Sequence, residues 1–124
     1  MSGSAPILIV KKPLAPAELA KLIGNPFPDM VKFVVDVERR VLAVGGQLHA
    51  DAEEVLLEGG SRQASLWGGN YHPGLGEAEC VEFESMINLR PSCGNLTMGV
   101  QDPKLRERIL DVVFALLGRG ETIP

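Results

Sequence analysis

The strongest constraint on the fold is a pair of β-branched runs separated by only three charged residues. The runs are residues 31–37 and 41–44, and the charged residues are 38–40. Because β-branched side chains lose rotamer freedom in a helix, the pattern favours a β-hairpin. A single helix through residues 30–42 remains an alternative, since the connection lacks the glycine that is typical of hairpin turns.

Short helices are predicted on both sides of this hairpin. Residues 16–23 carry a proline in the first turn and are followed by Gly24, as expected for a short helix. In residues 51–54 an Asp-x-x-Glu capping box makes Asp51 the N-cap residue of a helix that ends near Gly59.

Three more segments have the composition or the alternation of β-strands. Residues 7–10 form a short apolar run, which is typical of a buried strand. Residues 63–71 predict a strand that Gly68 and Gly69 interrupt or bulge. Residues 80–90 alternate most regularly, with mainly apolar side chains at odd positions and mainly polar ones at even positions, so we expect one long strand there.

The C-terminal helix is the element that the sequence defines most clearly. It runs from Asp102, its N-cap residue, through Pro103 in the first turn to Leu117. Residues 109–117 contain one polar side chain, Asp111, and a helix that is apolar nearly all round is buried on more than one side. We therefore predict that the helix from Asp102 to Leu117 also packs against a second copy of the chain, forming a homo-oligomer.

Together these segments predict an α+β fold with the element order β-α-β-β-α-β-β-α. Hairpin-length links join most of the strands, so we expect a largely antiparallel sheet of about five strands, with the helices mainly on one face. The 124 residues suit one domain that buries a core without a metal or disulfide. We expect a single domain over residues 1–124, with residues 1–5 flexible.

Charge and composition argue against several classes of partner. The formal net charge is −4, and the cations are scattered among acids, which makes nucleic acid an unfavourable partner. No apolar run has the length of a bilayer span or of a signal peptide, so we expect a cytoplasmic protein without a membrane segment. Cys80 and Cys93 lack the spacing of a zinc site, and they are either reduced thiols or one disulfide.

The most distinctive polar stretch is Gly-Gly-Gln-Leu-His-Ala-Asp at residues 45–51. Its glycines and the amides of the helix start could bind an anion. Alternatively, His49 and Asp51 could bind a divalent metal, because imidazole and carboxylate ligands suit Mn, Fe or Zn. Further ligands would come from Asp36, Glu38, His72, Glu82 or Glu84. In a purely structural interpretation, Asp51 caps the helix and His49 bonds to the backbone.

A second group of polar and aromatic side chains comes later in the chain. Its members are Trp67, Asn70, Asn88, Arg90, Ser92 and Asn95. Because a guanidinium matches carboxylate and phosphate bidentately, Arg90 with these amides could recognise such a ligand. In the structural alternative, Arg90 pairs with Glu84 or caps a chain end, and Trp67 lies in or beside the core. The sequence contains no G-x-S-x-G elbow, P-loop or dinucleotide-binding fingerprint.

Several of these segments together resemble one protein family. They are residues 34–39, 45–53, 60–63, 66–68 with Asn70, and 82–92. The set resembles, over roughly residues 30–117, a small bacterial family that carries a domain-of-unknown-function label. The resemblance implies a free-standing protein of similar length and no particular activity. The family pattern includes the equivalents of Asp36, His49, Asp51, Trp67, Asn70, Asn88 and Arg90. His72 and Cys93 depart from it, with Gln in place of Cys93.

Two functions are compatible with these patterns. One is a non-enzymatic module that forms a homo-oligomer and binds a small ligand or a partner through its polar sheet face. The other is a small metal-dependent hydrolase or phosphoesterase-like enzyme that uses His49 with Asp36 or Asp51. If His49, Asp36 and Arg90 line one cleft, the enzyme or ligand-site interpretation gains support; if they lie on separate surfaces, it loses support.

Overall fold

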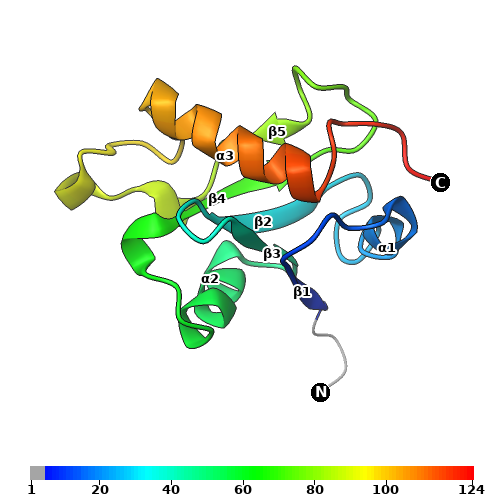
Figure 1. Ribbon diagram of the computed structural model, residues 1–124, viewed down its shortest axis with the longest axis horizontal. Helices are drawn as coiled ribbons and strands as arrows, with labels where there is room; N and C mark the ends of the chain where they lie inside the picture. The colour runs from blue at the N-terminus through cyan, green and yellow to red at the C-terminus, as the bar shows by residue number, and fades with distance from the viewer. Residues whose placement is uncertain (1–4) are drawn as a thin grey trace.

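The computed structural model describes residues 5–124, and Figure 1 shows the arrangement of its elements. The strands are β1 (Ile7–Val10), β2 (Val31–Asp36), β3 (Val41–Gly45), β4 (Leu66–Tyr71) and β5 (Val81–Glu82), and the helices are α1 (Pro16–Ala20), α2 (His49–Glu58) and α3 (Pro103–Leu116). Short 3-10 helices lie at Gln63–Ser65, Met86–Asn88 and Pro91–Cys93. The expectation that residues 1–5 are flexible concerns mainly residues 1–4, which lie outside the described range.

The strands form one antiparallel sheet in the order β1-β3-β2-β4-β5. This confirms the α+β fold and the five-stranded antiparallel sheet. When helices and strands alone are considered, their order along the chain is the predicted one, although several lengths differ and the 3-10 helices were not expected. Within residues 5–124, no helix combines the length and the apolar character that crossing a membrane requires.

The β2–β3 hairpin forms without a turn glycine because Asp36 and Arg40 replace it. Oδ1 of Asp36 accepts hydrogen bonds from the amides of Glu38 at 3.0 Å and Arg39 at 2.9 Å. Arg40 adopts a φ of +56°, in the left-handed region that glycine usually provides. The hairpin prediction is therefore confirmed, and the alternative of a helix through this segment is wrong.

The sheet separates two apolar cores, because successive residues of a strand point to opposite faces. Phe33 and Val35 face the core beneath α1 and α3, whereas Val34 packs with Ala52 and Leu56 of α2. Figure 1 shows α3 and α2 on opposite sides of the sheet. The expected placement on one face thus holds for α1 and α3 but not for α2. The physical reason is that β2 and β3 are apolar on both faces and need cover on each.

The long strand expected at residues 80–90 is wrong beyond its start. β5 pairs with β4 only through the partners Glu82–Asn70 and Val81–Tyr71. The amide of Glu84 then donates to the carbonyl of Glu82 at 3.1 Å, which turns the chain away from the sheet. Alternation alone does not reveal this departure, since the same spacing also suits an irregular segment whose polar side chains turn inward.

Two other boundaries also differ from their predictions. Helix α2 begins at His49 rather than after Asp51, and its N-cap residue Leu48 provides no side-chain hydrogen bond. Asp51 is exposed in the first turn, so it is not the cap. Strand β4 begins at Leu66, because residues 63–65 form a 3-10 helix.

Helix α3 agrees closely with its prediction. Oδ1 of Asp102 accepts a hydrogen bond from the amide of Lys104 at 3.0 Å, and Pro103 occupies the first turn. The side chains of Ile109, Val112, Val113 and Leu116 are buried, whereas Leu110 and Phe114 are half-buried. Contact with a second copy of the chain remains a prediction. Elsewhere, Cys80 is buried, Cys93 is exposed and neither forms a disulfide.

Candidate functional site

The outer edge of β4 is completed by three different partners in succession. At Asn70 the partner is the backbone of β5. At Gly68 it is the side-chain amide of Asn88, whose Oδ1 accepts from the Gly68 amide at 2.8 Å and whose Nδ2 donates to the Gly68 carbonyl at 2.9 Å. At Leu66 the guanidinium of Arg90 donates to the backbone carbonyl. Side chains thus continue the pairing where the fifth strand stops.

Asn88 and Arg90 consequently have structural roles. Asn88 is fully buried, and its Nδ2 also donates to the carbonyl of Met98 at 3.0 Å. Arg90 donates to the carbonyls of Ile87 at 2.9 Å and Gln63 at 2.8 Å. Its guanidinium also lies 4.2 Å from the ring centre of Trp67, in cation–π contact. These contacts connect the 84–99 segment to the sheet.

Asn95 organises the same segment from within. Its Nδ2 lies within 3.0 Å of three backbone carbonyls, and its Oδ1 accepts from the amide of Gln101 at 3.0 Å. The predicted group of Asn and Arg residues therefore does not form one ligand site. The side-chain polar atoms of Asn88, Arg90 and Asn95 are hydrogen-bonded to the protein's own backbone. Asn70 is the amide in the group with an unused polar atom.

Of the acidic residues proposed as metal ligands, Glu84 shares a cavity with His49, but Asp36 and Asp51 do not. Asp36 is 1% exposed and belongs to the β2–β3 turn, whereas Asp51 is exposed on α2. Among residues 5–124, no three His, Cys, Asp or Glu side chains are placed to bind one metal ion together. His72 instead lies 3.2 Å from Glu82 at the β5 edge.

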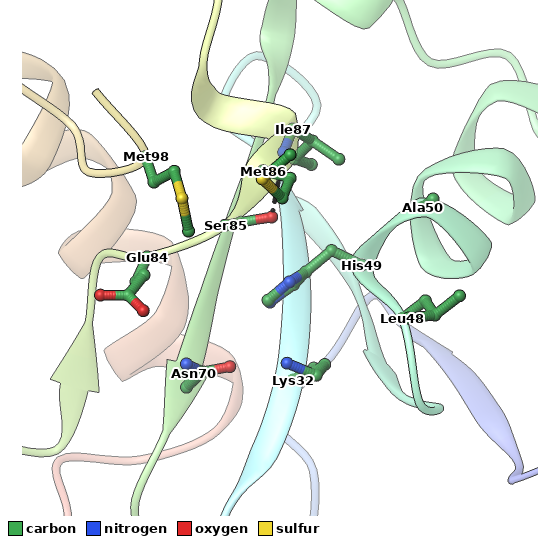
Figure 2. Close-up of a pocket in the computed structure, with 10 residues that line it drawn as sticks. All are labelled: Lys32, Leu48, His49, Ala50, Asn70, Glu84, Ser85, Met86, Ile87 and Met98. Atoms are coloured by element: carbon green, nitrogen blue, oxygen red, sulfur yellow. Dashed lines mark hydrogen bonds between the residues drawn. The ribbon is translucent and has the colours of Figure 1, made fainter. Parts of the chain in front are cut away.

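His49 and Asn70 do share a cavity, which we call the α2 pocket. It has a volume of about 280 Å³ and lies where the start of α2 faces β2, β4 and the segment after β5 (Figure 2). It is lined by Lys32, Leu48, His49, Ala50, Asn70, Glu84, Ser85, Met86, Ile87 and Met98. Neither Asp36 nor Arg90 lines it, so the convergence of His49, Asp36 and Arg90 that would favour an enzyme or a ligand site is not observed.

Two adjacent glycines of β4 permit the close packing beside this pocket. A Cβ at Gly68 would lie 2.7 Å from Cβ of Ser85 and 3.2 Å from Cδ2 of His49. On the opposite face, a Cβ at Gly69 would lie 2.6 Å from Cζ of Phe33. Neighbouring side chains therefore approach the backbone closely at Gly68 on one face of the sheet and at Gly69 on the other. The strand β4 continues through both glycines without the predicted interruption.

His49 is the first residue of α2 and is 8% exposed. Its Nε2 lies 2.7 Å from the carbonyl oxygen of Gly69, which can only accept, so Nε2 carries the proton. Burial lowers the pKa of His49 below its ordinary value, and the ring is therefore neutral at pH 7. In that tautomer Nδ1 is an acceptor, and no hydrogen bond among residues 5–124 uses it.

The burial of His49 makes a pH-dependent contribution to stability. Its pKa is near 6.5 in the unfolded chain and lower in the folded protein. Between these values the unfolded state binds more protons, so the free energy of unfolding decreases as the pH falls below about 6.5. The variant His49→Gln lacks this titration, and its stability should decrease less between about pH 7 and pH 5. Urea denaturation tests this, and parallel pH profiles for the two proteins would contradict it.

Asn70 lies in a polar row that crosses three strands at the floor of the pocket. Lys32 is its partner on β2 and Glu82 its partner on β5. Nδ2 of Asn70 donates to Oε1 of Glu82 at 2.9 Å, which fixes the orientation of the amide. Oδ1 is buried and has no hydrogen-bond partner, and Figure 2 shows it turned toward the side of the pocket where Lys32 and His49 lie.

The rim of the pocket is apolar and accessible. Leu48 is 59% exposed, Met86 is 70% exposed and Met98 is 37% exposed. A concave site with an apolar wall and a few convergent polar atoms is the usual form of a small-ligand site. The volume of about 280 Å³ lies just below the range of pockets for drug-sized ligands, so a smaller molecule fits better.

Sequence reasoning identified His49, Asn70 and Glu84 but missed most of the residues around them. Lys32 could have been found, because it is the one cation in β2 and lies on the same face as the buried Val34. Met86 and Met98 gave no usable signal. They reach the pocket only because the chain leaves the sheet after Glu82.

A comparison with protein families bears on this site. The family model described as "Protein of unknown function (DUF5674)" matches residues 8–116. The chain belongs to this family. Membership confirms the resemblance to a domain-of-unknown-function family. No curated protein and no solved structure matches the chain. The family description specifies no activity, so a functional assignment depends on the geometry of the α2 pocket.

Proposed function

We propose that this protein is a non-enzymatic module that binds a small molecule in the α2 pocket. The observation that carries the proposal is the buried, unpartnered Oδ1 of Asn70 at the pocket floor. A buried polar atom without a partner is costly, by about 1–3 kcal/mol. A ligand that donates a hydrogen bond to Oδ1 would remove this cost and would thereby contribute to binding.

The surroundings of Asn70 support a ligand rather than a further protein contact. Nδ1 of His49 offers a second acceptor, and Lys32 provides a half-buried cation. The scaffold that supports these groups is fully hydrogen-bonded at Asn88, which positions the wall of the pocket through Gly68 and Met98. A rigid support of this kind favours a preformed site.

The alternative of a metal-dependent hydrolase has less support. It requires Asp36 or Asp51 beside His49, but Asp36 lies in the hairpin turn and Asp51 does not line the pocket. Ser85 does line the pocket, but its hydroxyl accepts a hydrogen bond from the amide of Ile87 at 3.2 Å. A binding function therefore accounts for more of the geometry than a catalytic one.

Filling the pocket should abolish ligand binding without unfolding the protein. Ala50 is exposed and lines the α2 pocket, so the side chain of Ala50→Trp can occupy it. We expect small fragments, screened as mixtures by amide NMR, to perturb the amides around His49 and Asn70 in the wild type. The same fragments should leave Ala50→Trp unperturbed, because its pocket is occupied.

A second cavity provides the matched control. It has a volume of about 390 Å³ and lies between α1, α3 and the C-terminal residues, where the exposed Ala115 lines it. Ala115→Trp should leave fragment binding at the α2 pocket intact. Perturbations confined to the α1–α3 cavity, or unaffected by Ala50→Trp, would contradict the proposed site.

Self-association through the helix from Asp102 to Leu117 forms a further part of the proposal. The half-buried Leu110 and Phe114 supply apolar area on this helix, and Arg119 partly covers Phe114 through a contact of 4.9 Å to its ring centre. Sedimentation at high protein concentration tests the idea, and a strictly monomeric protein would refute it.

A further inference from the structure

The α2 pocket contains both free acceptors and free donors, which constrains the chemistry of its ligand. This inference rests on the proposed function and refines it. The acceptors are Oδ1 of Asn70, which is buried without a partner, the exposed carboxylate of Glu84, and Nδ1 of the neutral His49 ring. Figure 2 shows Glu84 on the side of the pocket nearer β5, and Asn70 with its oxygen turned toward Lys32 and His49. A ligand group facing these acceptors must donate hydrogen bonds and is stabilised by a positive charge.

The donors lie on the side of β2 and α2. Lys32 makes no ion pair with any residue from 5 to 124, and its ammonium lies 5.0 Å from the ring centre of Phe27. Helix α2 has ten residues, and its N-cap Leu48 leaves the first-turn amides without a side-chain acceptor. A cation and a helix N-terminus both favour a negative group. The start of α2 thus provides donors, whereas the unpartnered oxygen of Asn70 provides an acceptor.

The remaining lining is apolar. Leu48, Met86 and Met98 are accessible at the rim, and Ile87 is half-buried beside them. Flexible methionine side chains adapt to apolar groups of differing shape. The pocket therefore offers groups that favour an anion, groups that favour a cation, and an adaptable apolar wall within about 280 Å³.

We propose that the ligand of the α2 pocket is a free α-amino acid with an apolar side chain. Its carboxylate faces Lys32 and the first turn of α2, and its ammonium faces Oδ1 of Asn70 and the carboxylate of Glu84. Its side chain contacts Met86 and Met98. A simple anion leaves the Asn70 oxygen unpaired and is repelled by Glu84, whereas a simple cation is repelled by Lys32 and the helix start.

Four small probes separate these possibilities on the wild-type protein. L-leucine carries all three features; 4-methylpentanoate lacks the ammonium; 3-methylbutylamine lacks the carboxylate; glycine lacks the apolar side chain. Amide NMR titration should show L-leucine perturbing the residues around His49 and Asn70. Each of the other probes should bind at least about tenfold more weakly, because each leaves one part of the pocket unsatisfied.

Two pocket variants test the individual contacts. Asn70→Leu should weaken L-leucine binding about tenfold or more by removing the acceptor for the ammonium, and Lys32→Met should do the same for the carboxylate. Glu58→Gln, which is exposed at the far end of α2, should leave the affinity unchanged. Amide spectra establish that each variant is folded, and the probe comparison requires no variant.

The outcomes distinguish this inference from the broader proposal. L-leucine binding with the stated order of probes supports it. If neutral fragments bind the α2 pocket while L-leucine does not, or if the carboxylate or amine alone binds as well as L-leucine, the amino-acid inference is wrong and the ligand site stands. If neither fragments nor L-leucine perturb the pocket, both are wrong.

Discussion

Replacing Asn88 by leucine is expected to lower the free energy of unfolding by about 3–5 kcal/mol. The side chain is fully buried, and its amide pairs with the amide and the carbonyl of Gly68 and with the carbonyl of Met98. Leucine has a similar size but leaves the amide and the carbonyl of Gly68 without partners in the interior, whereas the Met98 carbonyl keeps the amide of Ser85 as a donor. Each such group costs about 1–3 kcal/mol, part of which local relaxation recovers. Urea denaturation measures the loss.

The same substitution should also loosen the segment that follows β5. Asn88 connects β4 to the carbonyl of Met98, and Met98 lines the α2 pocket. Hydrogen exchange should therefore accelerate at the amide of Gly68 and at that of Ser85, which donates to the Met98 carbonyl at 2.9 Å. A loss of stability below about 1 kcal/mol would show that water or a rearranged loop replaces the amide.

The second large effect is expected for Gly69→Ala. The new Cβ would lie 2.6 Å from Cζ of the fully buried Phe33 and 2.7 Å from the carbonyl oxygen of Glu82. Neither neighbour can move freely, because one is a core aromatic ring and the other is the backbone of β5. We expect a loss of about 3 kcal/mol, at the upper end of the usual cost of overpacking. Thermal and urea unfolding provide the measurement.

A matched control is available for this substitution. Gly59 follows α2 with a φ of −83°, and a Cβ there would lie 3.5 Å from the nearest atom, which is ordinary contact. Gly59→Ala should therefore change the free energy of unfolding by less than about 1 kcal/mol. If Gly59→Ala and Gly69→Ala destabilise equally, close approach is not the reason for the glycine in β4.

Sequence patterns were sufficient where one local preference dominates. The β-branched runs predicted the β2–β3 hairpin, and Asp102 with Pro103 predicted the start of α3. The turn of the hairpin could not be recognised from a glycine in the sequence, because Asp36 and Arg40 take the role that glycine usually has. A β-branched pattern can therefore predict a hairpin even when its turn is formed by residues that are uncommon in hairpin turns.

Patterns failed where tertiary contacts override a local period. The alternation through residues 80–90 predicts a strand, but only Val81 and Glu82 pair with β4. Asn88 and Arg90 still meet the edge of β4, through side chains rather than through backbone. The alternation was therefore misleading after Glu82, because the polar Asn88 is buried there and the apolar Leu89 is exposed.

The candidate site was only partly predictable for the same reason. His49 and Asn70 were both singled out from the sequence, but their meeting depends on a helix and a strand placed by the two cores. Asp36 and Arg90 belonged to the same family pattern, yet they stabilise the hairpin turn and the β4 edge. Motif membership alone does not separate residues that support a site from those that contact its ligand.

Asn88 is assigned to the scaffold and Asn70 to the ligand site. The most direct test of this assignment compares the free energies of unfolding of Asn70→Leu and Asn88→Leu, both measured without ligand. Asn70→Leu loses a hydrogen bond to the partly exposed Glu82 but also removes a buried oxygen without a partner. We predict a change within about 1 kcal/mol of the wild type, against the loss of about 3–5 kcal/mol for Asn88→Leu. Equal, large losses in both variants would place Asn70 in the scaffold and contradict the assignment of the α2 pocket as a ligand site.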